Sequence, residues 1–193
     1  MYKAILAGMV IGLGGLGFLK FNGDLVGCLL LSTGLVLAKE MRFYIWTGGG
    51  KRANVNGLIG NLIGVMMIVF LGFNLDWASR SAYFMLAIGP GVKDIYTVIA
   101  QGIFAGVLLQ IFIKVNDLAT EWLTGILFGV VGSRLFILEL MRVFLKGDDL
   151  WRGALYLLIV LFSNLIGSNL ISAKRRSKND RSVQNKRRDS ENG

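Results

Sequence analysis

The tetrapeptide N-L-I-G stands at 61–64 within NGLIGNLIGVMMIVFLGFN (56–74), and it returns at 164–167 within LLIVLFSNLIGSNLIS (157–172). Both copies lie in apolar segments long enough to cross a bilayer, for which an α-helix needs about 20 residues. Each segment therefore predicts a membrane-spanning helix that carries one polar amide followed by one small residue.

The whole chain has the composition of a membrane protein. Of its 193 residues, 54% are apolar and only 17% are charged, whereas a soluble domain has about a quarter of charged residues. We expect an all-α integral membrane protein of the cell membrane, with a segment at 82–90 that is too short to cross. Six apolar runs predict six transmembrane helices, at about 4–19, 25–46, 56–73, 95–113, 122–145 and 150–172.

A strongly basic segment follows the last predicted span. Residues 174–193 contain eight Lys and Arg against three acids, and no aromatic residue that could stack on a nucleic-acid base. We interpret this segment as a disordered cytoplasmic tail attracted to anionic lipid, with no nucleic-acid partner. Since Lys and Arg collect on the cytoplasmic side, an even number of spans places both termini inside. The transmembrane domain would then comprise residues 1–173.

The spans suggest an internal duplication. The first and fourth spans align at an offset of 94, which pairs Gly8 with Gly102, and the third and sixth align at 103 through the tetrapeptide. The second and fifth align less well, at an offset of 100 that pairs Met41 with Met141. These offsets rise in order along the chain, as expected after duplication of one unit and drift of its loops.

The repeat units would cover residues 1–75 and 95–173. Because each unit has an odd number of spans, its second copy enters the membrane from the opposite side. The result is an inverted 3+3 repeat, an arrangement that places a binding site or conduction path near the bilayer midplane.

The repeated Asn and Gly have two possible roles. Gly64 and Gly167 allow helix backbones to approach each other, and the amides of Asn61 and Asn164 can hydrogen-bond a neighbouring segment where water is absent. Close helix packing is one interpretation, and direct contact with a permeant molecule is the other.

Several motifs together resemble the formate/nitrite transporter family. That family has a Gly-Leu-rich second span that ends in a Leu-Phe-Thr-Gly-Asn-like break, to which GL at 34–35 and IWTGG at 45–49 are similar. Its third and sixth spans carry a Gly-Asn-hydrophobic-hydrophobic-Gly motif. GNLIG at 60–64 matches this motif fully, and SNLIG at 163–167 matches all but its first Gly.

The resemblance implies an aquaporin-like homopentamer in which each protomer has its own pore for small monovalent anions or their weak acids, such as formate, nitrite or hydrosulfide. The second and fifth spans would be interrupted at the pore. Gly48 and Gly49 would supply the backbone freedom for one break, and Thr47 corresponds to the family's loop threonine, whose hydroxyl faces the path. The alternative is a helix that ends in a Gly-rich turn.

One departure from the family concerns its mid-pore histidine in the fifth span. The present chain contains no His, and the corresponding position falls on Leu135 or Leu140. A mechanism in which an imidazole shares a proton with the permeant ion is therefore not available to this chain.

Charged side chains occupy both spans that the family interrupts. A charge near the bilayer centre costs several kcal/mol or more, so such a residue usually faces a cavity or a partner of opposite charge. These residues could attract anions to two vestibules of the path, or they could pair with each other and only stabilise the broken helices. They are Lys39, Glu40 and Arg42 in the second span, and Arg134, Glu139 and Arg142 in the fifth.

The sequence predicts transport and no enzymatic chemistry. It contains no Cys/His metal cluster, no His-based nucleophile pair and no phosphate-binding loop, so we expect no metal and no cofactor. Basic side chains would concentrate the anion, and an apolar constriction would favour its passage as the neutral acid. A channel or carrier for a neutral small solute and a non-transporting membrane scaffold remain as alternatives.

Overall fold

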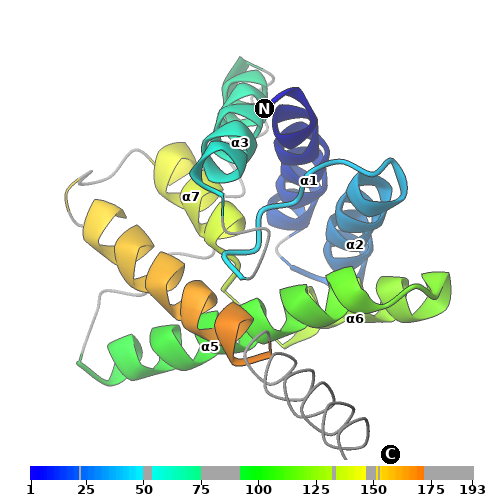
Figure 1. Cartoon of the computed structure of the whole chain (residues 1–193). Coiled ribbons are helices and arrows are strands. Elements are labelled where there is room, and N and C mark those ends of the chain that lie inside the picture. The colour runs from blue at the N-terminus through cyan, green and yellow to red at the C-terminus, as the bar shows by residue number, and fades with distance from the viewer. Residues whose placement is uncertain are drawn as a thin grey trace, which may run out of the picture.

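The computed structural model describes residues 1–21, 23–49, 54–74, 92–131, 134–146, 151 and 153–171. This part of the chain is helical and contains no strand (Figure 1). The predicted interfacial segment 82–90 and the basic tail 174–193 lie outside the described residues. The helices are α1 (Tyr2–Lys20), α2 (Leu25–Glu40), α3 (Val55–Asn74), α5 (Val92–Lys114), α6 (Leu118–Val130), α7 (Phe136–Lys146) and a C-terminal helix (Gly153–Ile171).

Four of these helices are long and apolar enough to cross a membrane, namely α1, α3, α5 and the C-terminal helix. The prediction of an all-α protein with membrane-compatible helices is therefore confirmed. The second and fifth predicted spans are not continuous helices. The helix α2 has 16 residues and α6 has 13, which gives them lengths of about 24 and 20 Å against a hydrocarbon core of about 30 Å.

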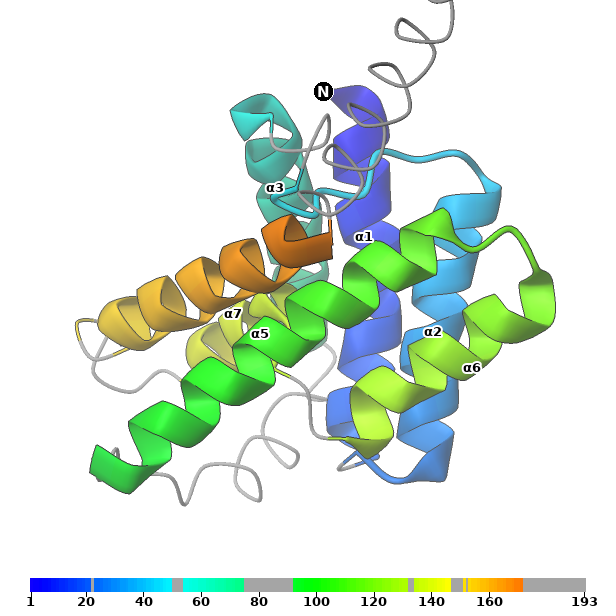
Figure 2. The ribbon, with the colours of Figure 1, turned by 60° about the horizontal axis from the view of Figure 1, so that its bottom comes forward.

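Two groups of helices meet in the fold. In the first, α1 packs against both α2 and α3. In the second, α5 runs beside α6 and the C-terminal helix, and Figure 2 shows this group crossing the first. The two groups are joined where α2 packs on α6. There Gly125 of α6 approaches the side chain of Ser32, whose hydroxyl donates to the carbonyl oxygen of Trp122 at 3.0 Å.

Local sequence explains where α2 begins and ends. The Asp24 side chain accepts a hydrogen bond from the Gly27 N–H at 2.8 Å and caps the first turn. At the other end, the N–H of Arg42 bonds to the carbonyl of Lys39, and the next N–H, of Phe43, bonds to the carbonyl of Ala38. This pattern is a Schellman motif, which requires a left-handed residue at the position of Arg42, and its φ is indeed 55°. The helix therefore ends before the Gly-rich stretch that the sequence suggested as the break.

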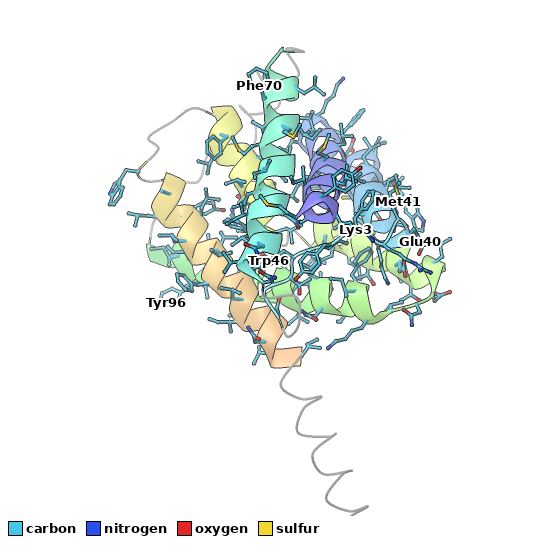
Figure 3. All side chains as sticks on the ribbon, turned by 45° about the horizontal axis from the view of Figure 1, so that its top comes forward. Lys3, Glu40, Met41, Trp46, Phe70 and Tyr96 are labelled. Carbon is cyan, nitrogen blue, oxygen red and sulfur yellow. The ribbon has the colours of Figure 1, made fainter. Side chains whose placement is uncertain are left out.

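Apolar side chains lie on the outside of the molecule as well as in its core. Phe70 and Tyr96 are 71% and 72% exposed, and both project away from the helices in Figure 3. Such surfaces are unfavourable in water and suit contact with lipid. Polar side chains are instead buried between the helices: Ser32, Thr47, Asn61, Gln110, Glu121, Thr124, Glu139, Ser163, Asn164 and Ser168.

Candidate functional site

The first non-helical segment, residues 43–47, is held by Asn61 of α3. The Asn61 Nδ2 donates to the carbonyl oxygen of Tyr44 at 2.9 Å and to that of Ala4 in α1 at 2.8 Å. Its Oδ1 accepts a hydrogen bond from the backbone N–H of Trp46 at 3.0 Å. Asn61 is 1% exposed, so this amide satisfies backbone groups that water does not reach.

The second non-helical segment, just before α7, is held in the same way by Asn164 of the C-terminal helix. The Asn164 Nδ2 donates to the carbonyl oxygens of Arg134 and of Gly102 in α5, each at 2.9 Å. Its Oδ1 accepts from the backbone N–H of Phe136 at 3.0 Å. Each Asn thus joins one interrupted segment to one long helix through two donated bonds and one accepted bond.

The glycines of the two tetrapeptides bring helix backbones together. A Cβ added at Gly64 would lie well under 3.0 Å from the carbonyl oxygen of Ile5, and one added at Gly167 would lie equally close to that of Ile103. Both positions therefore exclude any side chain. These contacts agree with the packing interpretation of the repeated Asn and Gly.

Contacts of two further glycines show which residues of the first and fourth predicted spans are equivalent. Gly8 approaches the carbonyl of Asn61, and Gly106 approaches that of Asn164. Gly8 and Gly106 are 98 residues apart, so the offset of 94, which pairs Gly8 with Gly102, does not match the contacts. The discrepancy of four residues is about one helical turn, which leaves the apolar and small positions on the same face and makes the two registers look alike in sequence.

The register between the two interrupted segments differs more strongly from the predicted one. Trp46 and Phe136 each donate a backbone N–H to the equivalent Asn, and they are 90 positions apart. The offset of 100, which pairs Met41 with Met141, does not match these contacts. Met41 is the exposed residue after α2, whereas Met141 is buried inside α7.

Thr47 is a buried polar residue in the first non-helical segment, residues 43–47. It is 2% exposed, and its hydroxyl oxygen accepts a hydrogen bond from Nε2 of Gln110 in α5 at 2.8 Å. With an offset of 90, the residue that corresponds to Thr47 is Ile137. Ile137 is 8% exposed, so the corresponding position in the second half is apolar and buried.

The two glycines after Thr47 have separate structural roles. Gly48 has a φ of 70°, and a Cβ there would also collide with the side chain of Leu165. Gly49 turns its N–H back to the Thr47 hydroxyl oxygen at 3.4 Å. A side chain at Gly48 would therefore be strained by both backbone conformation and space.

Lys39, near the end of α2, is directed toward the turn between α5 and α6. Its Nζ donates to the carbonyl oxygen of Phe112 at 2.8 Å, to that of Val115, and to Glu121 Oε1 at 2.5 Å. The Glu121 side chain is 3% exposed, and its Oε2 has no hydrogen-bond partner among the described residues. Lys39 and Glu121 form a neutral pair that ties the end of α2 to this turn.

Glu40 and Arg42 lie apart from these buried charges. Both are exposed, and Figure 3 shows Glu40 at the periphery of the molecule, close to Met41. The structure therefore brings Lys39 into a buried contact but does not bring Glu40 or Arg42 into the same environment.

A larger charged cluster surrounds the second interruption. The Glu139 carboxylate in α7 accepts from Arg142 through Oε1, and from the Tyr156 hydroxyl through Oε2 at 2.7 Å. The Arg134 guanidinium lies 3.7 Å from Glu139 Oε2 and also donates to the Tyr156 hydroxyl. Its Nε donates to Gln101 Oε1 at 2.8 Å. These five residues are called the Arg134 cluster below.

The break before α7 explains why Arg134 and Glu139 meet. In a continuous helix, residues five positions apart do not share a face, so the sequence offered no acidic partner for Arg134. Arg134 lies before the first residue of α7, and Glu139 lies in its first turn. The change of backbone direction between them brings the two side chains together.

Four partners of the predicted residues were missed by sequence reasoning. A polar side chain inside an otherwise apolar span is costly and usually has a partner or a function. This signal was present for the three that lie inside predicted spans, whereas Glu121 lies one residue before the predicted span 122–145. They are Gln101 and Gln110 in α5, Glu121 in α6 and Tyr156 in the C-terminal helix.

The described residues contain no group of three or more His, Cys, Asp or Glu side chains that could hold a metal ion. Neither a known family model nor a curated protein matches the chain. The function is therefore inferred from the geometry of the two interruptions and their charges.

Proposed function

We propose that the protein is a membrane channel or transporter for small monovalent anions or their weak acids, such as formate, nitrite or hydrosulfide. The carrying observation is the pair of non-helical segments, each held by two hydrogen bonds to one Asn, whose third hydrogen bond goes to a long helix. Non-helical backbone at membrane depth occurs only where protein buries it or where it lines a water-filled cavity. Transport proteins use such interruptions to place polar groups on a substrate path.

The charges beside the interruptions favour an anion over a cation. Lys39 and Glu121 form a pair of one cation and one anion, whereas the Arg134 cluster places two guanidinium groups beside one carboxylate. Basic side chains at the mouth of a path raise the local concentration of anions. The apolar side chains around the second interruption, including Ile137 and Leu135, would strip water from the ion and favour the neutral acid.

The proposal includes six membrane crossings arranged as an inverted repeat and assembled as a homopentamer in the cell membrane, with both termini in the cytoplasm. The matching hydrogen bonds of Asn61 and Asn164 support two related halves. Native mass spectrometry in mild detergent tests the assembly. Five copies are expected, and a monomer or dimer at every protein concentration would contradict the pentamer.

Reconstituted flux measurements test the function directly. Proteoliposomes that contain the full chain would be challenged with formate, nitrite, hydrosulfide, acetate, chloride and glycerol. We expect flux of the weak-acid anions that increases as the pH falls, and no flux of glycerol. Substitution Arg134→Gln removes one fixed charge and should clearly reduce anion flux while the protein remains folded and oligomeric. A folded Arg134→Gln protein with unchanged formate and nitrite flux would contradict a role for this residue in the path.

One observation favours a neutral small solute as the second candidate. The hydrogen-bonded pair of Thr47 and Gln110 at the first interruption is buried and uncharged. A hydroxyl and an amide can recognise a neutral polar solute without an excess of charge. Glycerol flux that does not depend on pH, with no formate flux, would favour this candidate.

A further inference from the structure

The Glu139 carboxylate occupies a site that suits a small monovalent oxyanion. It is surrounded by the guanidinium groups of Arg134 and Arg142 and by the hydroxyl of Tyr156, all of which can donate hydrogen bonds to oxygen. Paired donors of this kind bind planar carboxylate-like anions well. Formate and nitrite have the same two-oxygen geometry as the head of the Glu139 side chain.

The side chains of the cluster are also largely shielded from solvent. The side chains of Arg134, Arg142 and Glu139 are 13%, 16% and 3% exposed. The neighbouring helix α3 contains no titratable side chain, and α1 carries titratable side chains only at its two ends. The helix α5 carries its ionisable side chains towards its two ends, and in the C-terminal helix Gly153–Ile171 the ionisable residue is Tyr156. Among the described residues, the ionisable groups that contact Glu139 are Arg134, Arg142 and Tyr156.

We propose that Arg134 and Arg142 form a binding site for a small carboxylate-like anion, and that Glu139 occupies this site until it takes up a proton. This inference rests on the proposed function and assigns its anion site and its proton acceptor. When a weak acid arrives, its O–H proton passes to a Glu139 oxygen. The resulting anion then takes the place of the carboxylate against the two guanidinium groups.

Charge balance favours this coupled exchange. Exchange of an ionised Glu139 for a protonated Glu139 and one bound anion leaves the net charge of the cluster unchanged. Binding of the anion alone would place it against the negatively charged Glu139 carboxylate, and uptake of the proton alone would leave two guanidinium groups close together without the Glu139 counter-charge. Both are costly in a buried site of low dielectric constant. The proton and the anion therefore bind and leave together.

Proton uptake during anion binding tests the inference on the full chain in detergent. Sodium formate would be added to a weakly buffered sample at several pH values between about 5 and 8. The amount of bound formate and the number of protons that the protein takes up from the medium would both be measured. We expect about one proton taken up per bound formate, and a formate affinity that falls by up to about tenfold per pH unit as the pH rises.

Two isosteric variants provide the comparison. Glu139→Gln keeps the shape of the side chain but does not titrate, so formate should still bind, without proton uptake and with an affinity independent of pH. Glu121→Gln is the matched control, because Glu121 is equally buried and also pairs with a cation. It should keep the proton uptake and the pH slope of the wild type.

The outcomes separate this inference from the proposed function. Formate flux in wild-type proteoliposomes together with formate binding that takes up no proton would overturn the inference and leave the proposed function standing. The same holds if Glu139→Gln retains the wild-type pH slope. Absence of both formate binding and formate flux in the wild type would overturn both. If Glu139→Gln does not fold, the proton count on the wild-type protein still decides the matter.

Discussion

Asn61 and Asn164, which hold the two non-helical segments, are called the Asn clamps. Replacement of either one by Leu should destabilise the protein strongly. Leu has the branched shape of Asn, so the substitution removes the hydrogen bonds without leaving a cavity. In Asn61→Leu, the N–H of Trp46 and the carbonyl of Tyr44 lose their partner inside the protein. Each buried backbone group left unsatisfied costs about 1–3 kcal/mol, so we expect a loss of about 2–6 kcal/mol. That is a large part of a typical unfolding free energy of about 5–15 kcal/mol.

The assay is thermal or denaturant-induced unfolding of the purified protein in detergent. The matched control is Asn169→Leu, because the Asn169 amide donates to the carbonyls of Leu165 and Gly48 from an exposed position. The control should change the unfolding free energy by less than about 1 kcal/mol. Since Asn164 makes the same three bonds as Asn61, the two clamp variants should lose similar stability. Clamp variants as stable as the Asn169 control would refute the reasoning.

Three further predictions concern small local features. Gly64→Ala should lower the unfolding free energy by about 1–3 kcal/mol or prevent folding, because the added Cβ would collide with the Ile5 carbonyl oxygen. Gly12→Ala should have a smaller effect in the same unfolding assay, because its Cβ would meet only the side chain of Ile68 at 3.2 Å. Arg42→Gly should raise the unfolding free energy by up to about 1 kcal/mol, since φ is 55°, and a destabilised variant would contradict this explanation. Hydrogen bonds from the Thr120 side chain and backbone lower the pKa of the Asp117 carboxyl below the usual aspartate value of 3.8. Its stabilising effect should therefore be complete above that pH and be lost as the pH falls through the folded-state pKa, so the difference in melting temperature between wild type and Asp117→Ala should shrink only in strong acid.

The sequence predicted those features of the fold that depend on local pattern. Six apolar runs predicted six membrane-spanning helices, and four of these runs form continuous helices long and apolar enough to cross a membrane. This part of the prediction succeeded because hydrophobic length is a property of each segment alone. The repeated tetrapeptide located both Asn clamps, since an amide in an apolar helix requires partners. The Gly-rich stretch after Thr47 suggested an interrupted second span, whereas in the described part of the chain α2 ends at Glu40 and the next helix is α3.

Registers and pairings between distant segments could not be read in the same way. A shift of four residues leaves a helix with nearly the same face, so apolar sequence does not distinguish an offset of 94 from one of 98. The partners of Lys39 and Arg134 also depend on how α5, α6 and the C-terminal helix cross the rest of the molecule. Glu121 lies 82 positions from Lys39 along the chain, and Tyr156 lies 22 positions from Arg134.

The two non-helical segments satisfy their backbone hydrogen bonds in the same way, but they carry different polar side chains. Non-helical backbone in an apolar environment exposes N–H and carbonyl groups, and in both segments an Asn from a neighbouring helix satisfies them. Beside the first interruption, the buried hydroxyl of Thr47 meets the amide of Gln110, while the corresponding position in the second half is the apolar Ile137. The second interruption instead contains the charged Arg134 cluster. The backbone solution is therefore duplicated, whereas the side chains that could contact a permeant molecule are different in each half. A path that passes both segments would meet the uncharged Thr47–Gln110 pair at one of them and the charged Arg134 cluster at the other.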